Sequence, residues 1–364
     1  MKLKTQGFIL IDVDVVALNN AGKSTNSNFD NAVATKKVFK NGRAYTYVSG
    51  QAWRYWWREA LQKNHGWEVS PITRDNKIAF TAADPIKYAD DDIFGYMKAA
   101  KDVIVDEDGK PVLKNGKEQT ENVTVTRVSP LKNSVIVSVG STRPAENWSS
   151  MARQEGDSVP YVKEEYSAIM KGMFSLDLDQ AGTFSNYNKT GFKNLTEKLK
   201  EEALTNGASE IDDTYVKDGK GNPQKLVRLA KEIREGRIDD TLKALKNISG
   251  GAMQTNNMAD VTPKFIVLAT TSTGNHPFSH IVSNEGINND KVYLNVDGIK
   301  EVLKDYFEQF QGMVYIGRRS GFLDEYSDAI KELESLGEGY PKVKIGSINE
   351  TIDNYCQQLK SQLI

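Results

Sequence analysis

Apolar and polar positions alternate near the start of the chain in the way that predicts a β-strand. Over residues 8–18, apolar Ile11 and Val13 alternate with charged Asp12 and Asp14. A period of two puts the apolar side chains on one face and the charged ones on the other. We therefore expect a strand with one apolar and one charged face here, followed by a polar loop over residues 19–31.

Residues 49–63 have the clearest helical pattern in the chain. Their apolar positions recur at helical spacing and form one stripe, which consists of Trp53, Trp56, Trp57, Ala60 and Leu61. A single stripe predicts packing against a core rather than an exposed aromatic surface. Ser49 is a typical N-cap residue. The same helix has a separate polar ridge formed by Gln51, Arg54 and Arg58.

The remaining pattern predicts an α+β fold. Residues 33–48 are extended around an Asn41-Gly42 turn. Further strands are expected over 135–139, 168–178 and 265–269, and helices over 192–206, 297–311, 324–336 and 348–362. A helix is also expected over 226–248, with a break near Gly236. The order strand, helix, strand, strand, helix, strand suits an RRM-like (ferredoxin-like) sheet with insertions rather than a doubly wound fold. The connection over 140–167 has little regular pattern, and 64–127 has the character of an insertion with a charged hairpin.

Composition and charge limit the classes of function. The chain has 364 residues, 39% hydrophobic and 26% charged, with a net charge of −2, so a nucleic-acid site must be a local patch. The single Cys356 excludes an internal disulfide framework and a thiolate zinc cluster. His276 and His280 are separated by Pro277 and lack further ligands, so we expect neither metal nor cofactor. No apolar run reaches membrane-spanning length, and we expect a cytoplasmic protein without a membrane partner.

A local basic patch is present between residues 31 and 63. Seven cations and one acid, Glu59, give this segment a charge of +6. The cations are Lys36, Lys37, Lys40, Arg43, Arg54, Arg58 and Lys63. Such residues neutralise backbone phosphates without reading sequence, and the helix start at Ser49 adds backbone amide donors. An ordinary solvated basic surface has the same composition, so charge alone leaves both interpretations open.

Two loops and an acidic run offer further candidates. Residues 21–25 read Ala-Gly-Lys-Ser-Thr and resemble the end of a P-loop, but Ala17 replaces the first glycine, which leaves Lys23 as a phosphate contact. Gly250 and Gly251 precede Met253 and Gln254, a pattern that suits either close ligand approach or a helix C-cap and turn. We interpret residues 90–92, Asp-Asp-Asp, as a solvated turn or a helix start.

Five short stretches together resemble one protein family. They are Leu-Asn-Asn at 18–20, Val-Ser-Gly-Gln-Ala-Trp-Arg at 48–54, Asp-Asp-Ile-Phe-Gly-Tyr-Met at 91–97, Thr-Arg-Val-Ser-Pro-Leu at 126–131 and Gly-Ala-Met-Gln at 251–254. In this order they resemble the DevR-type (DevR/Cst) backbone subunit of type I CRISPR Cascade complexes. The third and fourth stretches are similar to its type I-B branch.

The resemblance implies a fold and a set of partners. It implies an RRM-like palm formed by 1–63 and 128–364, a fingers insertion at 64–127, and a long thumb β-hairpin at about 140–167. Copies of such a subunit assemble as a filament along the CRISPR guide RNA with other Cascade subunits. The thumb kinks the RNA, and the open bases pair with a target DNA strand.

The resemblance also implies individual contacts. By motif match, RNA contact is expected at Asn19, Asn20, Lys23, Ser49, Gln51, Arg54, Met253 and Gln254, and local charge adds Lys36, Lys37, Arg43 and Arg58. In the thumb, the base wedge or clamp candidates are Arg143, Trp148, Met151 and Arg153. Because 140–167 contains three basic and five acidic residues, we expect its acids to face away from RNA, towards a neighbouring subunit.

Three other functions compete with this non-catalytic role. Asp30 is located where related type III subunits have a catalytic aspartate, so a metal-dependent ribonuclease is the first alternative. A stand-alone autoregulator that binds duplex DNA is the second. A P-loop nucleotide hydrolase built around Lys23 is the third.

Overall fold

The computed structural model describes residues 2–24, 31–75, 78–99, 101–103, 111–114, 117–122, 124–151, 155–188, 192–284 and 291–363. The chain forms two compact units. The first contains Met1–His65, Lys132–Leu176 and Asp240–Gln362, and the second contains Gly66–Leu131, Asp177–Asp239 and Leu363–Ile364. The second unit therefore joins the predicted insertion to a later segment that the sequence analysis had assigned to the palm.

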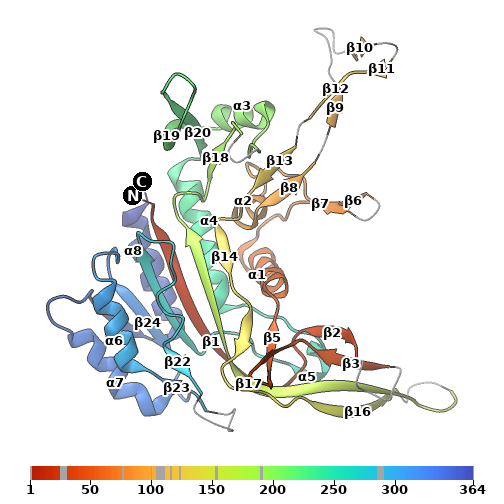
Figure 1. Ribbon diagram of the computed structural model, residues 1–364, viewed down its shortest axis with the longest axis vertical. Helices are drawn as coiled ribbons and strands as arrows, with labels where there is room; N and C mark the ends of the chain where they lie inside the picture. The colour runs from red at the N-terminus through yellow and green to blue at the C-terminus, as the bar shows by residue number, and fades with distance from the viewer. Residues whose placement is uncertain are drawn as a thin grey trace. The chain divides into compact units, whose positions relative to one another are not determined.

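The first unit is built on a large, mostly antiparallel sheet, shown in Figure 1. Its main path runs β25 (Val343–Gly346), β24 (Val314–Arg318), β21 (Phe265–Thr271), β1 (Lys4–Val16), β17 (Val159–Asp177), β15 (Ile136–Ser138), β5 (Arg43–Val48) and β4 (Lys37–Lys40). Strands β24 and β25 form a parallel pair on this path, whereas β21 pairs antiparallel with β1 and with β24. Together with the helices, this sheet confirms the predicted α+β class.

Helix α1 (Gly50–His65) covers one face of the sheet with its tryptophans. Trp53 and Trp57 are fully buried and stack on each other, and both meet the ring of Phe174 edge to face. Gly7 makes room for Phe174, because a Cβ there would lie 2.1 Å from that ring. The indole nitrogen of Trp57 donates to the Thr241 carbonyl at 2.7 Å. The prediction that the tryptophan stripe forms core is confirmed.

Helix α8 (Ile348–Gln362) lies on the same face as α1, further along the sheet. The hydroxyl of Tyr355 is fully buried and donates to the hydroxyl of Thr5 at 2.8 Å, with the Thr270 hydroxyl 3.0 Å away. Gly317 allows close packing, since a Cβ there would lie 2.8 Å from the Thr351 hydroxyl. The predicted helix over 348–362 is confirmed.

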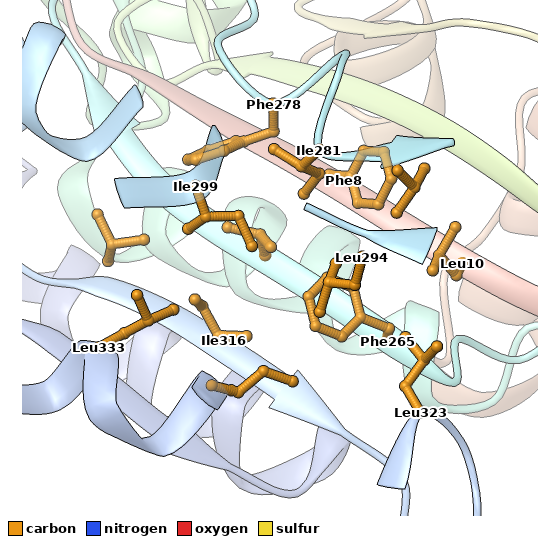
Figure 2. Packing of buried hydrophobic residues seen from close by; sticks show 14 of the residues in the cluster. Phe8, Leu10, Phe265, Phe278, Ile281, Leu294, Ile299, Ile316, Leu323 and Leu333 are labelled. Carbon is orange, nitrogen blue, oxygen red and sulfur yellow. The ribbon is translucent and has the colours of Figure 1, made fainter. Parts of the chain in front are cut away.

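A second hydrophobic cluster covers the opposite face of β24, β21, β1 and β17. Phe8, Leu10, Phe265 and Ile316 contribute from the strands and pack against residues of the C-terminal elements, as Figure 2 shows. Those elements are β22 (Val282–Ser283), β23 (Tyr293–Leu294), α6 (Val296–Asp305), η2 (Asp324–Tyr326), α7 (Ser327–Glu332) and η3 (Leu333–Ser335). The cluster stops at β17, and β15, β5 and β4 contribute no residue to it.

A smaller sheet extends from the first half of β17. Strand β16 (Ala145–Met151) pairs with it antiparallel, and β3 (Ala32–Thr35) pairs with it in parallel. Strand β2 (Asn20–Lys23) then pairs with β3, so four strands run side by side in Figure 1. The segment 140–167, which showed little regular pattern in the sequence, is thus mainly a β-hairpin. Strand β14 (Leu131–Asn133), η1 (Ala244–Lys246) and α5 (Gln254–Asn257) complete the list for this unit.

The second unit has a small core around Phe184, Leu195, Ala203, Val227 and Leu229. Its main elements are α2 (Ala89–Phe94), α3 (Glu197–Thr205), α4 (Lys231–Lys243), β8 (Tyr96–Lys98), β13 (Val125–Arg127), β18 (Thr183–Ser185), β19 (Ser209–Lys217) and β20 (Pro223–Arg228). The short strands are β6 (Thr73–Asp75), β7 (Ile78–Phe80), β9 (Lys101–Val103), β10 (Leu113–Lys114), β11 (Lys117–Glu118) and β12 (Thr120–Asn122).

The predicted helix over 226–248 was wrong at its start and at its break. Val227 pairs with Phe184 in a strand, because burial against that ring outweighs the helical spacing of its neighbours. The helix begins at Lys231 and continues through Gly236. Gly236 is exposed, where a helical glycine costs only about 1 kcal/mol relative to alanine.

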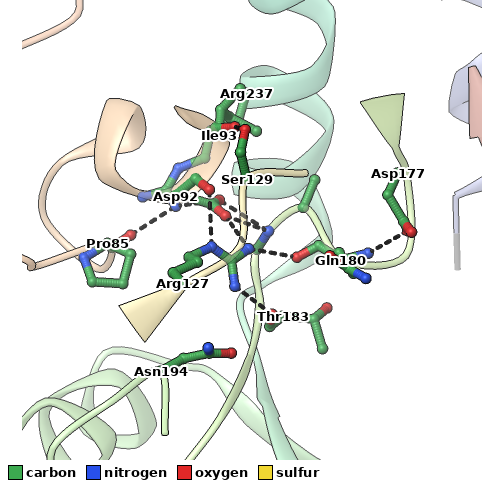
Figure 3. Close-up of polar contacts among 12 residues, drawn as sticks. Pro85, Asp92, Ile93, Arg127, Ser129, Asp177, Gln180, Thr183, Asn194 and Arg237 are labelled. Atoms are coloured by element: carbon green, nitrogen blue, oxygen red, sulfur yellow. Dashed lines mark hydrogen bonds and ion pairs between the residues drawn. The ribbon is translucent and has the colours of Figure 1, made fainter. Parts of the chain in front are cut away.

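The acidic run at 90–92 begins a helix, as predicted, but it is buried rather than solvated. Asp92 has no exposed surface and accepts hydrogen bonds from Arg127 Nη2 at 2.5 Å and Arg237 Nη1 at 2.8 Å. Figure 3 shows its carboxylate between the two guanidinium groups. The backbone nitrogen of Gly182 donates to the same carboxylate at 2.9 Å.

Residues 91–97 and 126–131, two of the stretches on which the family resemblance rests, therefore contact each other. Besides the Asp92 pair, the Ser129 hydroxyl donates to the Ile93 carbonyl at 2.8 Å. Gly95 has φ +74°, and a Cβ there would lie 2.5 Å from the Arg127 carbonyl oxygen. The residue types at 91–97 and 126–131 are thus fixed by their mutual packing inside the second unit.

Candidate nucleic-acid interface

The end of β1 and the start of α1 meet through the side chain of Asn19. Its Oδ1 accepts a hydrogen bond from the Ser49 backbone nitrogen at 2.9 Å, and its carbonyl accepts from the Lys36 nitrogen at 2.9 Å. The Ser49 hydroxyl accepts from the Ala52 nitrogen at 3.3 Å, which makes Ser49 the predicted N-cap. The structure thus brings Asn19 and Ser49 together, with both side chains holding this junction.

The glycine-containing loop lies against the same junction. The Ala252 nitrogen donates to the Leu18 carbonyl at 3.0 Å. Gly251 has φ +114°, and a Cβ there would lie 2.8 Å from a Leu18 methyl carbon. A Cβ on Gly250 would lie 2.2 Å from the indole ring of Trp56. The paired glycines are therefore needed for close packing of the loop on β1 and α1, which brings Met253 to the predicted site.

Met253 and Gln254 differ in how they can contact a ligand. Met253 has left-handed backbone angles, φ 59° and ψ 33°, and is half-buried. The Gln254 side-chain amide donates to the Gly250 carbonyl and, at 3.2 Å, to the Ala259 carbonyl. Gln254 therefore uses its side-chain donors within its own loop, whereas Met253 adopts a left-handed backbone conformation that is uncommon for residues other than glycine.

Arg54 and Arg58 form a pair of like charges one helical turn apart on α1. Arg54 Nη1 donates to Asn133 Oδ1 at 3.1 Å, and Asn133 in turn donates to the Gly50 carbonyl at 3.2 Å. Burial, followed by the nearby charge of Arg58, lowers the pKa of Arg54 to about 10. A bound phosphate would oppose both effects, because a nearby negative charge favours the protonated guanidinium.

The only acid on α1 does not neutralise this pair. Glu59 Oε1 accepts from the Tyr55 hydroxyl at 3.1 Å and from Lys63 Nζ at 3.2 Å. Gln51 is exposed in the first turn of the same helix. The start of α1 and the Arg54–Arg58 pair therefore form a basic region of this helix, which we call the junction surface. The loop before Met253 packs against the Trp56 side of the same helix.

The small sheet carries the other sequence-predicted contacts. Asn20 and Lys23 are exposed on β2, and Trp148 is 63% exposed on β16. Sequence reasoning did not foresee that they share a sheet, because the parallel pairing of β3 with β17 joins segments about 130 residues apart. Arg143 is exposed just before β16. The backbone of Met151 ends β16, whereas Arg153 and Asp30 lie outside the described residues.

Lys37 is engaged inside the first unit rather than exposed for a phosphate. Its Nζ is 2.5 Å from Glu164 Oε1, and Thr35 donates its backbone nitrogen and its hydroxyl to Glu164 Oε2 at 2.8 and 2.9 Å. Burial raises the pKa of Glu164, but the hydrogen bonds from Lys37 and Thr35 outweigh it, so the pKa lies below its ordinary value.

Glu165 is neutralised in the same way on the other side of β17. Its Oε1 accepts from Lys163 Nζ at 2.7 Å and from Asn257 Nδ2 at 2.9 Å, and its Oε2 accepts from Asn147 Nδ2 at 2.7 Å. The expectation that the hairpin acids face a neighbouring subunit was therefore wrong for Glu164 and Glu165. Each has cationic and amide partners within this chain, which reduces the electrostatic objection to a nucleic-acid role for the hairpin, although Glu146, Glu155 and Asp157 are exposed.

Comparison with known proteins now assigns the chain to a family. Residues 9–293 match the family model described as "CRISPR-associated negative auto-regulator DevR/Csa2". The chain belongs to the DevR/Csa2 family. This confirms the DevR-type assignment made from the five short stretches. The matched span includes every predicted RNA-contact residue from Asn19 to Gln254, whereas α6, α7 and α8 lie beyond it.

Solved structures similar to this DevR/Csa2 member include chains titled "CRISPR RNA-guided surveillance complex" and "CRISPR RNA-guided surveillance complex, pre-nicking". Each is 10% identical, with a TM-score of 0.47, over 98% of this chain and 99% of the other. No curated protein matches the sequence. Within the described part of the chain, no group of three or more His, Cys, Asp or Glu side chains could hold a metal ion. No helix in that part is long and apolar enough to cross a membrane.

Proposed function

We propose that this DevR/Csa2 family member is a non-catalytic subunit that binds CRISPR guide RNA along its backbone in a Cascade-type surveillance complex. The observation that carries the proposal is the junction surface at the start of α1, where Asn19 holds Ser49 and the Arg54–Arg58 pair supplies charge. Three segments that are distant in sequence, at 18–19, 49–58 and 250–254, pack together there, and the family match covers all of them.

The junction surface suits RNA phosphates rather than bases. Arg54 and Arg58 provide charge, and the amides at the N-terminus of α1 provide donors for a phosphate oxygen. Phosphate contacts position a strand but carry no sequence information. Binding would therefore be independent of guide sequence, and the guide itself would read the target DNA strand by base pairing.

The β16–β17 hairpin with its small sheet fits the role of a thumb. Trp148 is 63% exposed on this hairpin, and an exposed indole can stack on or wedge between bases. Lys23 on β2 belongs to the same small sheet and would bind a neighbouring phosphate. Trp148→Ala should then weaken the regular kinking of the guide, which nuclease footprinting of the assembled particle would detect.

The sheet order supports an RRM-like palm. Taking β1, β15, β17 and β21 as the four core strands, with α1 after the first, the spatial order is β21, β1, β17, β15. This is the arrangement of a ferredoxin-like sheet, with the first strand between the third and the fourth. The remaining strands are additions at the two ends of that core.

Further copies of this chain would assemble along one guide, together with other Cascade subunits. Expression with the neighbouring genes and a CRISPR array, followed by sequencing of the RNA in the purified particle, tests this directly. Guide-length RNA with the repeat of the array, on a particle much larger than one chain, is the expected result. A monomer without nucleic acid would refute the proposal.

A ribonuclease alternative is tested on the same particle. Incubation with complementary RNA and Mg²⁺ should give no regular cleavage. Regular cuts that disappear in Asp30→Ala would replace the non-catalytic proposal by a catalytic one.

An autoregulator is the second candidate, because the family description itself names negative autoregulation. Specific retardation of the promoter of its own gene by the purified chain would favour it. Equal retardation of unrelated duplexes would not.

A further inference from the structure

The edge of the main sheet beyond β17 has a face that the described residues leave accessible. Strand pairing fixes which side chains share it: Lys171 is opposite Val137, Val137 is opposite Tyr47, and Tyr45 is opposite Val38. Directly paired residues lie on the same face of a sheet, and positions two apart along a strand return to it. Arg43 and Lys40, which pair with each other, therefore lie on this face as well.

This face is opposite to the one that α1 covers. Gly172, the neighbour of Lys171, packs against Trp53 of α1, since a Cβ there would lie 3.1 Å from that indole. The hydrophobic cluster on the Lys171 side of the sheet includes Ile169 of β17 but no residue of β15, β5 or β4. Val38 is 48% exposed, Lys40 and Arg43 are exposed, and Tyr45 and Tyr47 are half-buried.

The face combines aromatic rings with positive charge. We call it the open face and define it by Lys36, Val38, Lys40, Arg43, Tyr45, Tyr47 and Lys171. Lys36 belongs to it because its carbonyl accepts from the Tyr47 nitrogen at 3.0 Å. Four of the seven residues are cations, and the sequence has no acid between residues 31 and 58 or between 166 and 176.

The cations of the open face are close enough to repel each other. Burial, followed by the nearby charge of Lys40, lowers the pKa of Lys171, whose Nζ donates to the Ser279 carbonyl at 3.1 Å. Lys37, the neighbouring lysine on β4, alternates to the other face and is neutralised there by Glu164. Among the described residues, the cation that points away from the open face therefore has an acid as its partner, while none of the cations on that face forms an ion pair.

We propose that the open face is a second binding site for single-stranded nucleic acid, in which Tyr45 and Tyr47 stack on bases while Lys36, Lys40 and Arg43 bind phosphates. Aromatic side chains two positions apart on a strand suit successive bases, and stacking tolerates any sequence because every base has a π-face. The site is distinct from the junction surface because it lies on the sheet face opposite to α1, whereas the junction surface is at the start of that helix. The strand bound here is not the guide RNA of the proposed function, and this inference does not depend on that function.

The test uses the full-length chain and two labelled probes, a 15-nucleotide oligouridylate and a 15-nucleotide oligothymidylate. Binding is measured by fluorescence anisotropy over a range of salt, in an Arg54→Glu background that weakens the junction surface. Tyr45→Leu with Tyr47→Leu should weaken binding by tenfold or more while leaving the salt dependence unchanged. Lys40→Glu with Arg43→Glu should weaken binding and also reduce its salt dependence.

Two matched controls are available on the same chain. Phe39→Ala removes an exposed ring from β4 on the face opposite to Tyr45, and Lys304→Glu reverses an exposed charge on α6. Both should bind the probes like the parent. Crosslinking of a 4-thiouridine probe to the peptide that contains residues 43–48 would add direct evidence.

The outcomes separate this inference from the proposed function. Loss of probe binding in the tyrosine variant, with guide RNA still present in the purified particle, supports both. Unchanged probe binding in the tyrosine variant, or an equal loss in Phe39→Ala, overturns the second site whatever the guide does. A tyrosine variant that alters sedimentation but not probe binding would mean that a second protein copy covers the open face, and would also overturn it. If the affinities for the oligouridylate and the oligothymidylate differ strongly, the probe that binds more tightly identifies the bound strand as RNA or DNA.

Discussion

The carboxylate of Asp92 should be essential for the stability of the second unit. Replacing it by asparagine removes the buried carboxylate that pairs with the buried guanidinium groups of Arg127 and Arg237. Removing one partner of a buried ion pair costs about 3–5 kcal/mol, because the remaining charge stays desolvated. Here carbonyl groups still accept from both arginines, for example Pro85 from Arg237 at 2.8 Å and Thr183 from Arg127 at 3.0 Å. We therefore expect about 3 kcal/mol, the lower end of that range.

Hydrogen exchange measured by mass spectrometry is the suitable assay, since it reports each unit separately. A loss of about 3 kcal/mol corresponds to a more than hundredfold faster exchange for amides that open with the unit. The effect should appear in peptides that cover 89–98 and 125–131, with peptides of β1 and β21 unchanged. Asp218→Asn is the matched control, because Asp218 is an exposed acid of the same unit whose partners are local. Equal effects of the two substitutions would refute the reasoning, and so would a loss confined to the first unit.

Three further predictions concern the first unit. Arg54→Glu should weaken binding to all RNA sequences alike, by about tenfold or more, and reduce the salt dependence, as measured by anisotropy; a loss for one sequence only would contradict it. Gly250→Ala should destabilise the first unit by about 1–3 kcal/mol, because the new Cβ meets the Trp56 ring at 2.2 Å; urea unfolding would show this, and Gly337→Ala, where nothing lies within 4 Å, should be neutral. The hairpin should lose stability in acid: the pKa of Glu164 is lowered by its partners, so its contribution is complete above the ordinary pKa of 4.5 and declines as the pH falls through the folded-state value. Hydrogen exchange of β16 between pH 3 and 6 checks this, and Glu164→Gln should reduce the dependence, leaving the part that Glu165 contributes.

The parts of the fold that were predicted correctly are those with short-range causes. The tryptophan stripe of α1 and the apolar alternation of β1 depend on spacing within one segment, and both were visible in the sequence. The same holds for Ser49 as an N-cap, because capping involves a residue only three positions further on. The contact between Asn19 and Ser49 was expected only through the family resemblance. The sequence of a strand end does not indicate which helix start it contacts.

The parts that were missed have long-range causes. A run of three aspartates is normally solvated, and nothing near it shows that Arg127 and Arg237, 35 and 145 residues away, neutralise Asp92. The acids of the hairpin looked unfavourable for RNA until Lys37 was found beside Glu164. The open face could not be predicted for a similar reason. Lys36 and Lys37 are both lysines, and only the strand register shows that their side chains lie on opposite faces of the sheet.

Strand β17 has a consequence for how the protein could evolve. It is one uninterrupted strand of 19 residues that pairs with β16 and β3 in its first half and with β15 in its second. The spacing along it between Val162, opposite Trp148, and Lys171 of the open face is nine residues, or about 30 Å. Inserting two residues between these positions would move the hairpin outward by about 7 Å with every side chain on its present face. Inserting one would exchange the two faces of the hairpin and turn Glu164 away from Lys37. We therefore expect the length of β17 between these two positions to change in steps of two residues.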